Sequence, residues 1–124
     1  MTVQEVLAQT DAVKPNQFEE GMKLVWLNEV EGRVYQVMKL RKGSEDIQKP
    51  NISMDCMYND SLLLPDSFSA LYVHYLSAMI DYFNGETARY NNSMYMFNTA
   101  WSEFENYWYR EHGQVSDGSF GKQV

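Results

Sequence analysis

Two stripes of large apolar side chains, separated by a short polar turn, dominate the C-terminal half of the chain. In each stripe the apolar side chains recur every three or four residues, which places them on one side of an α-helix. The first stripe consists of Phe68, Leu71, Tyr72, Tyr75, Leu76, Met79, Tyr82 and Phe83, and the second of Tyr90, Met94, Phe97, Trp101, Phe104 and Trp108. Between them lies Asn84-Gly85-Glu86, whose first two residues tolerate positive φ. The pattern therefore predicts an αα-hairpin, because folding back lets the two stripes bury each other.

In the N-terminal half, the capping residues and the apolar spacing predict a short helix followed by a long one. Thr2 is expected to cap the first helix with Glu5 as its capping-box partner, and Lys14-Pro15 to end it. Asn16 is expected to cap the second helix, which should run from about residue 17 to residue 41. The apolar stripe of this second helix consists of Phe18, Met22, Val25, Trp26, Val30, Val34, Val37 and Met38, with Leu27 alongside.

Two glycines lie inside the second predicted helix, where each costs about 1 kcal/mol relative to alanine. We expect Gly21 and Gly32 to allow close packing against another helix, with a local break at Gly21 as the alternative.

The segment from Gly43 to Leu64 is the one long stretch without a helical period. Loops longer than about 12–15 residues are uncommon inside a compact domain and are usually functional or mobile. Short strands or a β-hairpin within it remain open alternatives, because its apolar residues alternate irregularly. We expect this segment to contact a partner, through Ile52, Met54, Met57, Tyr58, Leu62 and Leu63.

Three tyrosines of the fourth predicted helix fall outside its apolar stripe. Tyr95, Tyr107 and Tyr109 are further candidates for contact with a partner, because tyrosine combines an apolar ring with a hydroxyl that can form hydrogen bonds. Trp101 and Trp108 lie on the stripe and are expected in the core.

The fold class that follows is all-α. A chain of 124 residues has the length of one domain. We expect a single helical domain over residues 1–112, in which a long loop separates the second helix from the hairpin of the third helix, starting near Pro65, and the fourth. Residues 113–124 are rich in glycine and polar residues and are expected to form a loose tail.

The charge of the chain argues against nucleic acid as a direct ligand. The formal net charge is −7, whereas affinity for phosphate backbones comes largely from Lys and Arg. The small basic cluster of Lys39, Arg41 and Lys42 suits the C-terminal end of a helix. With a single cysteine, Cys56, a reducing compartment is favoured, and neither a signal peptide nor a membrane span is expected.

The residues that could carry catalysis are few. The chain has two histidines, and His74 lies beside the stripe of the third helix, where a structural role is favoured. The run from Asp81 to Glu86 lacks the ligand spacing of a calcium loop and fits a helix end and turn. The paired acids Glu19-Glu20, Glu29-Glu31 and Glu103-Glu105 are expected on solvated helix faces. We therefore expect no enzyme, no catalytic or metal site and no cofactor.

The order of several motifs resembles one group of virus proteins. Trp26-Leu27-Asn28-Glu29 is followed by Leu62-Leu63-Leu64-Pro65, then by Tyr72-Val73-His74-Tyr75-Leu76, Phe83-Asn84-Gly85-Glu86, Arg89-Tyr90-Asn91-Asn92 and Phe97-Asn98. Over residues 2–112 the chain resembles small proteins encoded among the head genes of tailed bacteriophages and prophages of Gram-positive bacteria. More distantly it is similar to the head–tail connector, or head-completion, family.

That resemblance implies a structural virion protein. Such proteins are helical bundles that assemble as a ring on the portal, extend the DNA channel and offer a surface to stopper or tail proteins. It implies that the segment from Gly43 to Leu64 is the projecting loop of the family. DNA would pass without specific binding, which an acidic channel wall favours. The expected location is the host cytoplasm during assembly and then the head–tail junction of the virion.

Two other classes of function remain open at this stage. An acidic phage-encoded inhibitor or DNA mimic would bind a basic groove on a host protein, but it would display its carboxylates on one exposed face. A small DNA-packaging or regulatory protein would need a basic recognition helix, which the second predicted helix does not provide.

Overall fold

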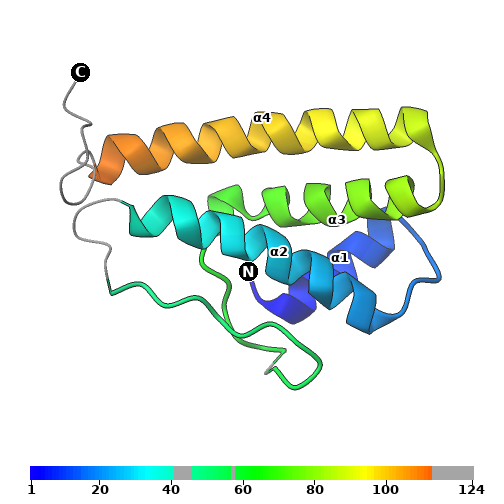
Figure 1. Ribbon diagram of the computed structural model, residues 1–124, viewed down its shortest axis with the longest axis horizontal. Coiled ribbons are helices and arrows are strands. Elements are labelled where there is room, and N and C mark those ends of the chain that lie inside the picture. Colours follow the sequence, from blue (N-terminus) through cyan, green and yellow to red (C-terminus); the bar gives the residue numbers. More distant parts are fainter. Residues whose placement is uncertain (41–45, 57, 113–124) are drawn as a thin grey trace.

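The fold is a bundle of four α-helices, seen in a computed structural model that describes residues 1–40, 46–56 and 58–112 (Figure 1). The helices are α1 (Val3–Val13), α2 (Glu20–Lys39), α3 (Ala70–Phe83) and α4 (Thr87–His112), and a short 3₁₀ helix, η1 (Asp66–Phe68), leads into α3. The predicted all-α class is confirmed. The predicted tail, residues 113–124, lies outside the described residues.

Helix α3 is the centre of the bundle, and α1, α2 and α4 each pack against it (Figure 1). The apolar stripe predicted for this helix is too narrow, because α3 is buried on almost every side. Its buried residues are Leu71, Tyr72, Val73, Tyr75, Leu76, Ser77, Ala78, Ile80 and Asp81. A helix that is apolar around most of its circumference belongs inside a bundle, and three neighbouring helices supply the cover.

The hairpin of α3 and α4 forms as predicted. Gly85 lies between the helices with φ of 72°, a conformation that favours glycine because it has no Cβ. Asn84 donates its backbone N–H to the carbonyl of Ile80 and thereby closes the last turn of α3. From α4, Phe97, Phe104 and Trp108 are buried in the core.

Helix α1 also begins and ends as predicted. The Thr2 hydroxyl accepts from the backbone N–H of Glu5, and the Glu5 carboxylate accepts from the backbone N–H of Thr2. This is a complete capping box. The helix ends at Val13, and Lys14 is its C-cap residue, directly before Pro15.

The predicted start of α2 is wrong by three residues. The Asn16 side chain accepts from the backbone N–H of Phe18 and donates to the carbonyl of Lys14, so it stabilises a turn and does not cap a helix. The helix begins at Glu20, and its N-cap residue Glu19 makes no side-chain capping bond.

The predicted buried face of α2 holds only in part. Trp26, Val30, Val34 and Met38 are buried as expected, and Leu27, which the prediction placed alongside, is buried too. In the first turns, however, Lys23 and Leu24 face the core, whereas Met22 and Val25 are 43% and 53% exposed. Because the contacts of α2 with α3 set which side of the helix faces the core, part of the predicted stripe remains exposed.

The two glycines of α2 do not face another helix, as had been expected. A Cβ at Gly21 would lie 3.6 Å from the sulfur of Met54, and one at Gly32 would lie 3.6 Å from Cε of Lys49. Both neighbours belong to the long segment between α2 and η1, so this segment packs along α2.

The described parts of the long segment are fixed to the N-terminus and to the core. Thr2 forms an isolated antiparallel bridge with Ser61, and the Gln4 backbone N–H donates to the carbonyl of Tyr58 at 2.9 Å. Apart from this bridge, no β-strand occurs in the described part of the chain. Figure 1 shows the segment on the side of the bundle away from α4.

Candidate docking surface

The first turns of α2 carry an exposed apolar groove. Met22 and Val25 project from α2, and the half-buried ring of Phe18 lies in the segment just before the helix. Together with Gln17, Glu19 and Gly21 these side chains line a groove of about 560 Å³. Apolar side chains that gather in a groove, unlike apolar residues scattered singly, mark a surface that a partner can cover.

A row of aromatic rings extends this groove to the end of α3. The Phe18 ring meets the edge of Trp26 at 5.5 Å between centroids, and Trp26 stacks on Phe83 at 5.6 Å. Tyr82 packs perpendicular to Phe83, at 5.0 Å. Phe83 is 53% exposed and Tyr82 58% exposed, so the row is buried at Trp26 and open to solvent at the end of α3.

The long segment completes this surface from the other side. Met54 is 63% exposed and lies against α2 at Gly21, where a Cβ would be 3.6 Å from its sulfur, an ordinary van der Waals contact. The Glu20 carboxylate beside the Tyr58 hydroxyl, together with partial burial, raises the pKa of Tyr58 to about 12. We name the surface formed by Phe18, Met22, Val25, Met54, Tyr82 and Phe83 the apolar patch.

The rim of the apolar patch is acidic. Glu19 lines the groove, Glu20 is the next residue, and Asp55 directly follows Met54; all three are exposed. The two lysines that come closest in the sequence are already paired: Nζ of Lys23 lies 2.9 Å and 3.1 Å from the carboxylate oxygens of Asp11, and Nζ of Lys14 lies 3.0 Å from Asp81. The patch therefore combines an apolar floor with negative charge at its edge.

A buried carboxylate holds the long segment in place beside α2. Glu31 of α2 is fully buried and accepts from the Tyr72 hydroxyl at 2.5 Å and from the Leu63 backbone N–H at 2.7 Å. The Tyr72 hydroxyl also accepts from the Leu64 backbone N–H at 3.0 Å. Burial raises the pKa of Glu31, although both hydrogen bonds and the charge of Lys49 oppose that effect. The prediction that Glu31 lies on a solvated face is wrong.

A second buried carboxylate holds the 14–19 segment, which connects α1 to α2, against the hairpin of α3 and α4. Asp81 of α3 is fully buried and accepts from the Lys14 ammonium and from the Ser93 hydroxyl of α4, each at 3.0 Å. Its other oxygen has no hydrogen-bond partner in the described structure. These bonds fix the end of α3 that presents Tyr82 and Phe83.

The partner-contact residues predicted in the long segment differ in how much of each side chain is exposed. Ile52 and Leu62 are 5% and 6% exposed and belong to the core, so their side chains offer no surface. Tyr58 and Leu63 are half-buried, and Met54 alone among these candidates is largely exposed. Met57 lies outside the described residues. The segment shields the core with its apolar residues, which explains their irregular alternation.

The three predicted tyrosines of α4 lie on another side of the molecule. Tyr95 is 67% exposed, and the half-buried Tyr107 packs against Phe68 at 4.8 Å between ring centroids. The Tyr109 hydroxyl is 3.5 Å from the carboxylate of Glu105. Figure 1 shows α4 on the side of α3 away from the long segment, so the tyrosines belong to a different part of the bundle than Met54 does.

Sequence reasoning missed Met22, Val25, Tyr82 and Phe83 as surface residues, because all four fit the periodic stripes. The available signal was the width of the α2 pattern, in which Met22 and Val25 lie apart from the buried Leu24 and Leu27. Which of them remain exposed depends on the packing of the helices and not on their spacing.

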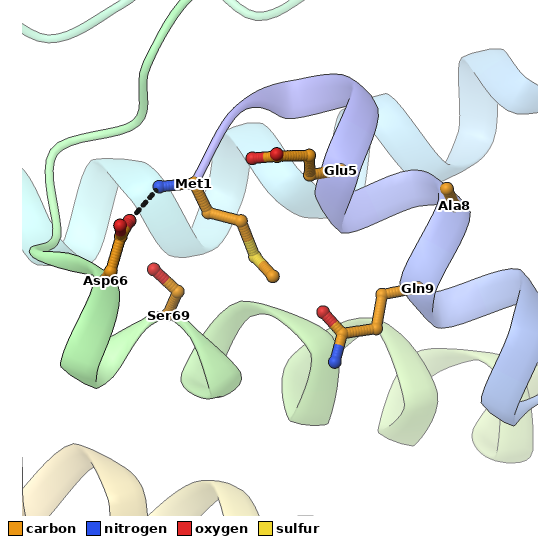
Figure 2. A pocket seen from close by; sticks show the side chains of 6 residues that line it. All are labelled: Met1, Glu5, Ala8, Gln9, Asp66 and Ser69. Atoms are coloured by element: carbon orange, nitrogen blue, oxygen red, sulfur yellow. Dashed lines mark hydrogen bonds and ion pairs between the residues drawn. The ribbon is translucent and has the colours of Figure 1, made fainter.

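A different groove, of about 530 Å³, lies beside the N-terminus and is shown in Figure 2. It is lined by Met1, Glu5, Ala8, Gln9, Asp66 and Ser69. The Met1 ammonium is 2.7 Å from the Asp66 carboxylate, and this contact lowers the pKa of Asp66. Since Glu5 is engaged in the capping box, both carboxylates of this groove already have partners.

The described residues offer little for metal binding or acid–base chemistry. No group of three or more His, Cys, Asp or Glu side chains there could hold a metal ion. His74 is half-buried in a shallow groove with Phe68, Met96 and Glu103, and burial lowers its pKa. Among the described helices none is long and apolar enough to cross a membrane.

Comparisons with protein-family models, with curated proteins and with solved structures find no match for this chain. The apolar patch is therefore interpreted from its own chemistry.

Proposed function

We propose that this chain is a structural protein that joins other protein subunits, and that it does so as a ring at the junction between a phage head and its tail. The observation that supports the joining role is the apolar patch, which three separate parts of the chain build at one end of the bundle. Exposed Met and aromatic side chains are typical of adaptable protein interfaces. The assignment to the head–tail junction rests on the resemblance of the motif order.

The charge of the molecule agrees with this role. A ring of chains that each carry a formal charge of −7 would surround DNA with negative walls, which repel phosphates and let the duplex slide. In this proposal the partners are other copies of the chain, the portal, and the stopper or tail proteins, and DNA is not bound specifically.

The test is a measurement of mass in solution by sedimentation, at rising protein concentration and with the purified portal ring encoded in the same genome. Association with itself or with the portal is the expected result. A chain that stays monomeric and binds neither the portal nor any neighbouring virion protein would overturn the proposal.

Two matched variants locate the surface. Met22 in the apolar patch and Met96 on α4 are both 43% exposed, so Met22→Glu and Met96→Glu introduce the same charge at equally accessible sites. We expect Met22→Glu to weaken binding at least tenfold and Met96→Glu to change it less than twofold. Equal effects of the two variants would exclude the apolar patch as the docking surface.

A further inference from the structure

The two ends of α2 carry exposed apolar side chains but opposite charge. At the N-terminal end lie Met22 and Val25 with the acidic Glu19 and Asp55 at the rim. At the C-terminal end Leu40 is 52% exposed, and the half-buried Tyr35 lies under Lys39, whose Nζ is 5.2 Å from the ring centroid. Two further basic residues, Arg41 and Lys42, follow Leu40 in the sequence. We name the surface of Tyr35, Lys39 and Leu40 the basic end.

These two surfaces cannot meet within one molecule. Helix α2 has 20 residues and spans roughly 30 Å, since each residue rises about 1.5 Å. Only a second copy of the chain can bring a basic end to the apolar patch.

The charges also decide between two ways of pairing copies. If the apolar patch paired with itself across a two-fold axis, Glu19 and Asp55 would face the same carboxylates of the partner, and like charges would oppose contact. If the patch received a basic end, the same carboxylates would face Lys39. Charge complementarity therefore favours contact between unlike surfaces.

Building on the proposed joining role, we propose that the basic end of one copy docks on the apolar patch of the next, head to tail. Leu40 enters the groove beside Met22 and Val25, and Lys39 lies against the acidic rim. This arrangement has the anatomy of a protein interface, an apolar centre with polar surroundings. A head-to-tail contact leaves one free patch and one free basic end in every open assembly, so association continues until a ring closes, or extends as a filament.

The test uses two complementary variants of the full chain. Met22→Glu with Val25→Glu disables the patch, and Lys39→Glu with Leu40→Glu disables the basic end. All four side chains are at least partly exposed, and a circular dichroism melt confirms that each variant is folded. Should either double variant fail to fold, Val25→Glu and Leu40→Glu replace the pair as single substitutions.

The expected result separates head-to-tail contact from every symmetric one. Each variant alone should be monomeric at a concentration at which the wild type associates. An equimolar mixture should form dimers and nothing larger, because one intact patch meets one intact basic end. Raising the salt concentration from 0.1 M to 0.5 M should weaken this dimer severalfold, since the charge contribution is screened. If the wild type associates only on the portal ring, the same comparison is made there.

Two outcomes would overturn the head-to-tail contact. One is a mixture that remains monomeric, and the other is a single variant that still forms the wild-type assembly. In either case the joining role survives if the wild type still associates or binds the portal. A wild type that neither associates with itself nor binds the portal would overturn the proposed function itself.

Discussion

Glu31 and Asp81 are both fully buried carboxylates, yet the bundle surrounds them with different partners. Asp81 accepts from the Lys14 ammonium and from the Ser93 hydroxyl, so a positive charge compensates its own. Among the described residues, Glu31 accepts from neutral donors alone, the Tyr72 hydroxyl and the Leu63 backbone N–H. One site is an ion pair, and the other is a hydrogen-bond cluster.

The difference shows two ways in which a bundle can fix a connecting segment. An ion pair holds the 14–19 segment against the hairpin, and it depends on one long side chain that is 24% exposed. The Glu31 cluster instead satisfies the backbone of the long segment directly, at Leu63 and, through Tyr72, at Leu64. A buried backbone N–H without a partner is costly, so this cluster selects one position for the segment.

The largest effect is expected where the compensating charge of Asp81 is removed. Lys14→Met leaves a buried carboxylate without a cation, which costs about 3 kcal/mol of the free energy of unfolding. Urea denaturation measures the loss, and Lys14→Arg, which keeps the charge, is the control. A loss below about 1 kcal/mol would show that Ser93 and solvent suffice for Asp81.

The Glu31 cluster should be sensitive to the loss of one hydroxyl. Tyr72→Phe removes a donor from Glu31 and leaves the Leu64 N–H without its acceptor, which should lower the free energy of unfolding by about 2 kcal/mol. Hydrogen exchange at Leu64 should speed up in parallel. Unchanged exchange at this amide would show that the tyrosine does not hold the segment.

The Glu31 cluster should also respond to pH. Because burial raises the pKa of Glu31 above its ordinary value of 4.5, the folded state holds this proton more tightly than the unfolded chain does. The contribution of Glu31 to stability is therefore greatest below pH 4.5 and falls as the pH rises through the raised pKa. The unfolding free energy of the wild type minus that of Glu31→Gln should therefore decline between pH 4.5 and the raised pKa. A difference that increases with pH would contradict the assigned direction.

The smallest effect is expected at the neighbouring tyrosine, which gives a matched control for Tyr72. The Tyr75 hydroxyl donates to Glu29 at 3.1 Å, as Tyr72 does to Glu31, but Glu29 is exposed and can bond water instead. Tyr75→Phe should therefore cost only about 0.5 kcal/mol in thermal or urea unfolding. If Tyr72→Phe and Tyr75→Phe lower the unfolding free energy equally, burial of the carboxylate does not explain why one tyrosine is expected to matter more.

The sequence predicted best those features that depend on neighbouring residues. The capping box of Thr2 and Glu5 and the turn at Gly85 were both predicted, because each is determined within four or five residues. The start of α2 was misplaced since Asn16 can cap a helix or stabilise a turn, and the local pattern is the same for both.

The features that failed depend on contacts between distant parts of the chain. Glu31 has the sequence context of a solvated helix acid, and only the arrival of Tyr72 and Leu63 makes its burial tolerable. For the same reason the apolar patch could not be separated from the core: Val25 and Val30 belong to one predicted stripe, yet 53% of the first and none of the second is exposed. The partner-contact candidates in the long segment were chosen because the whole segment lacks a helical period, and among those that the structure describes only Met54 is largely exposed.

The central position of α3 has a consequence for the order of events during synthesis. Helices α1 and α2 leave the ribosome first, but the helix against which both pack is translated later, roughly sixty residues after α1. At about 5–20 residues per second, α1 waits several seconds before its packing surface exists. Folding of this chain is therefore timed by the arrival of α3, and until then the apolar faces of α1 and α2 lack the helix that covers them.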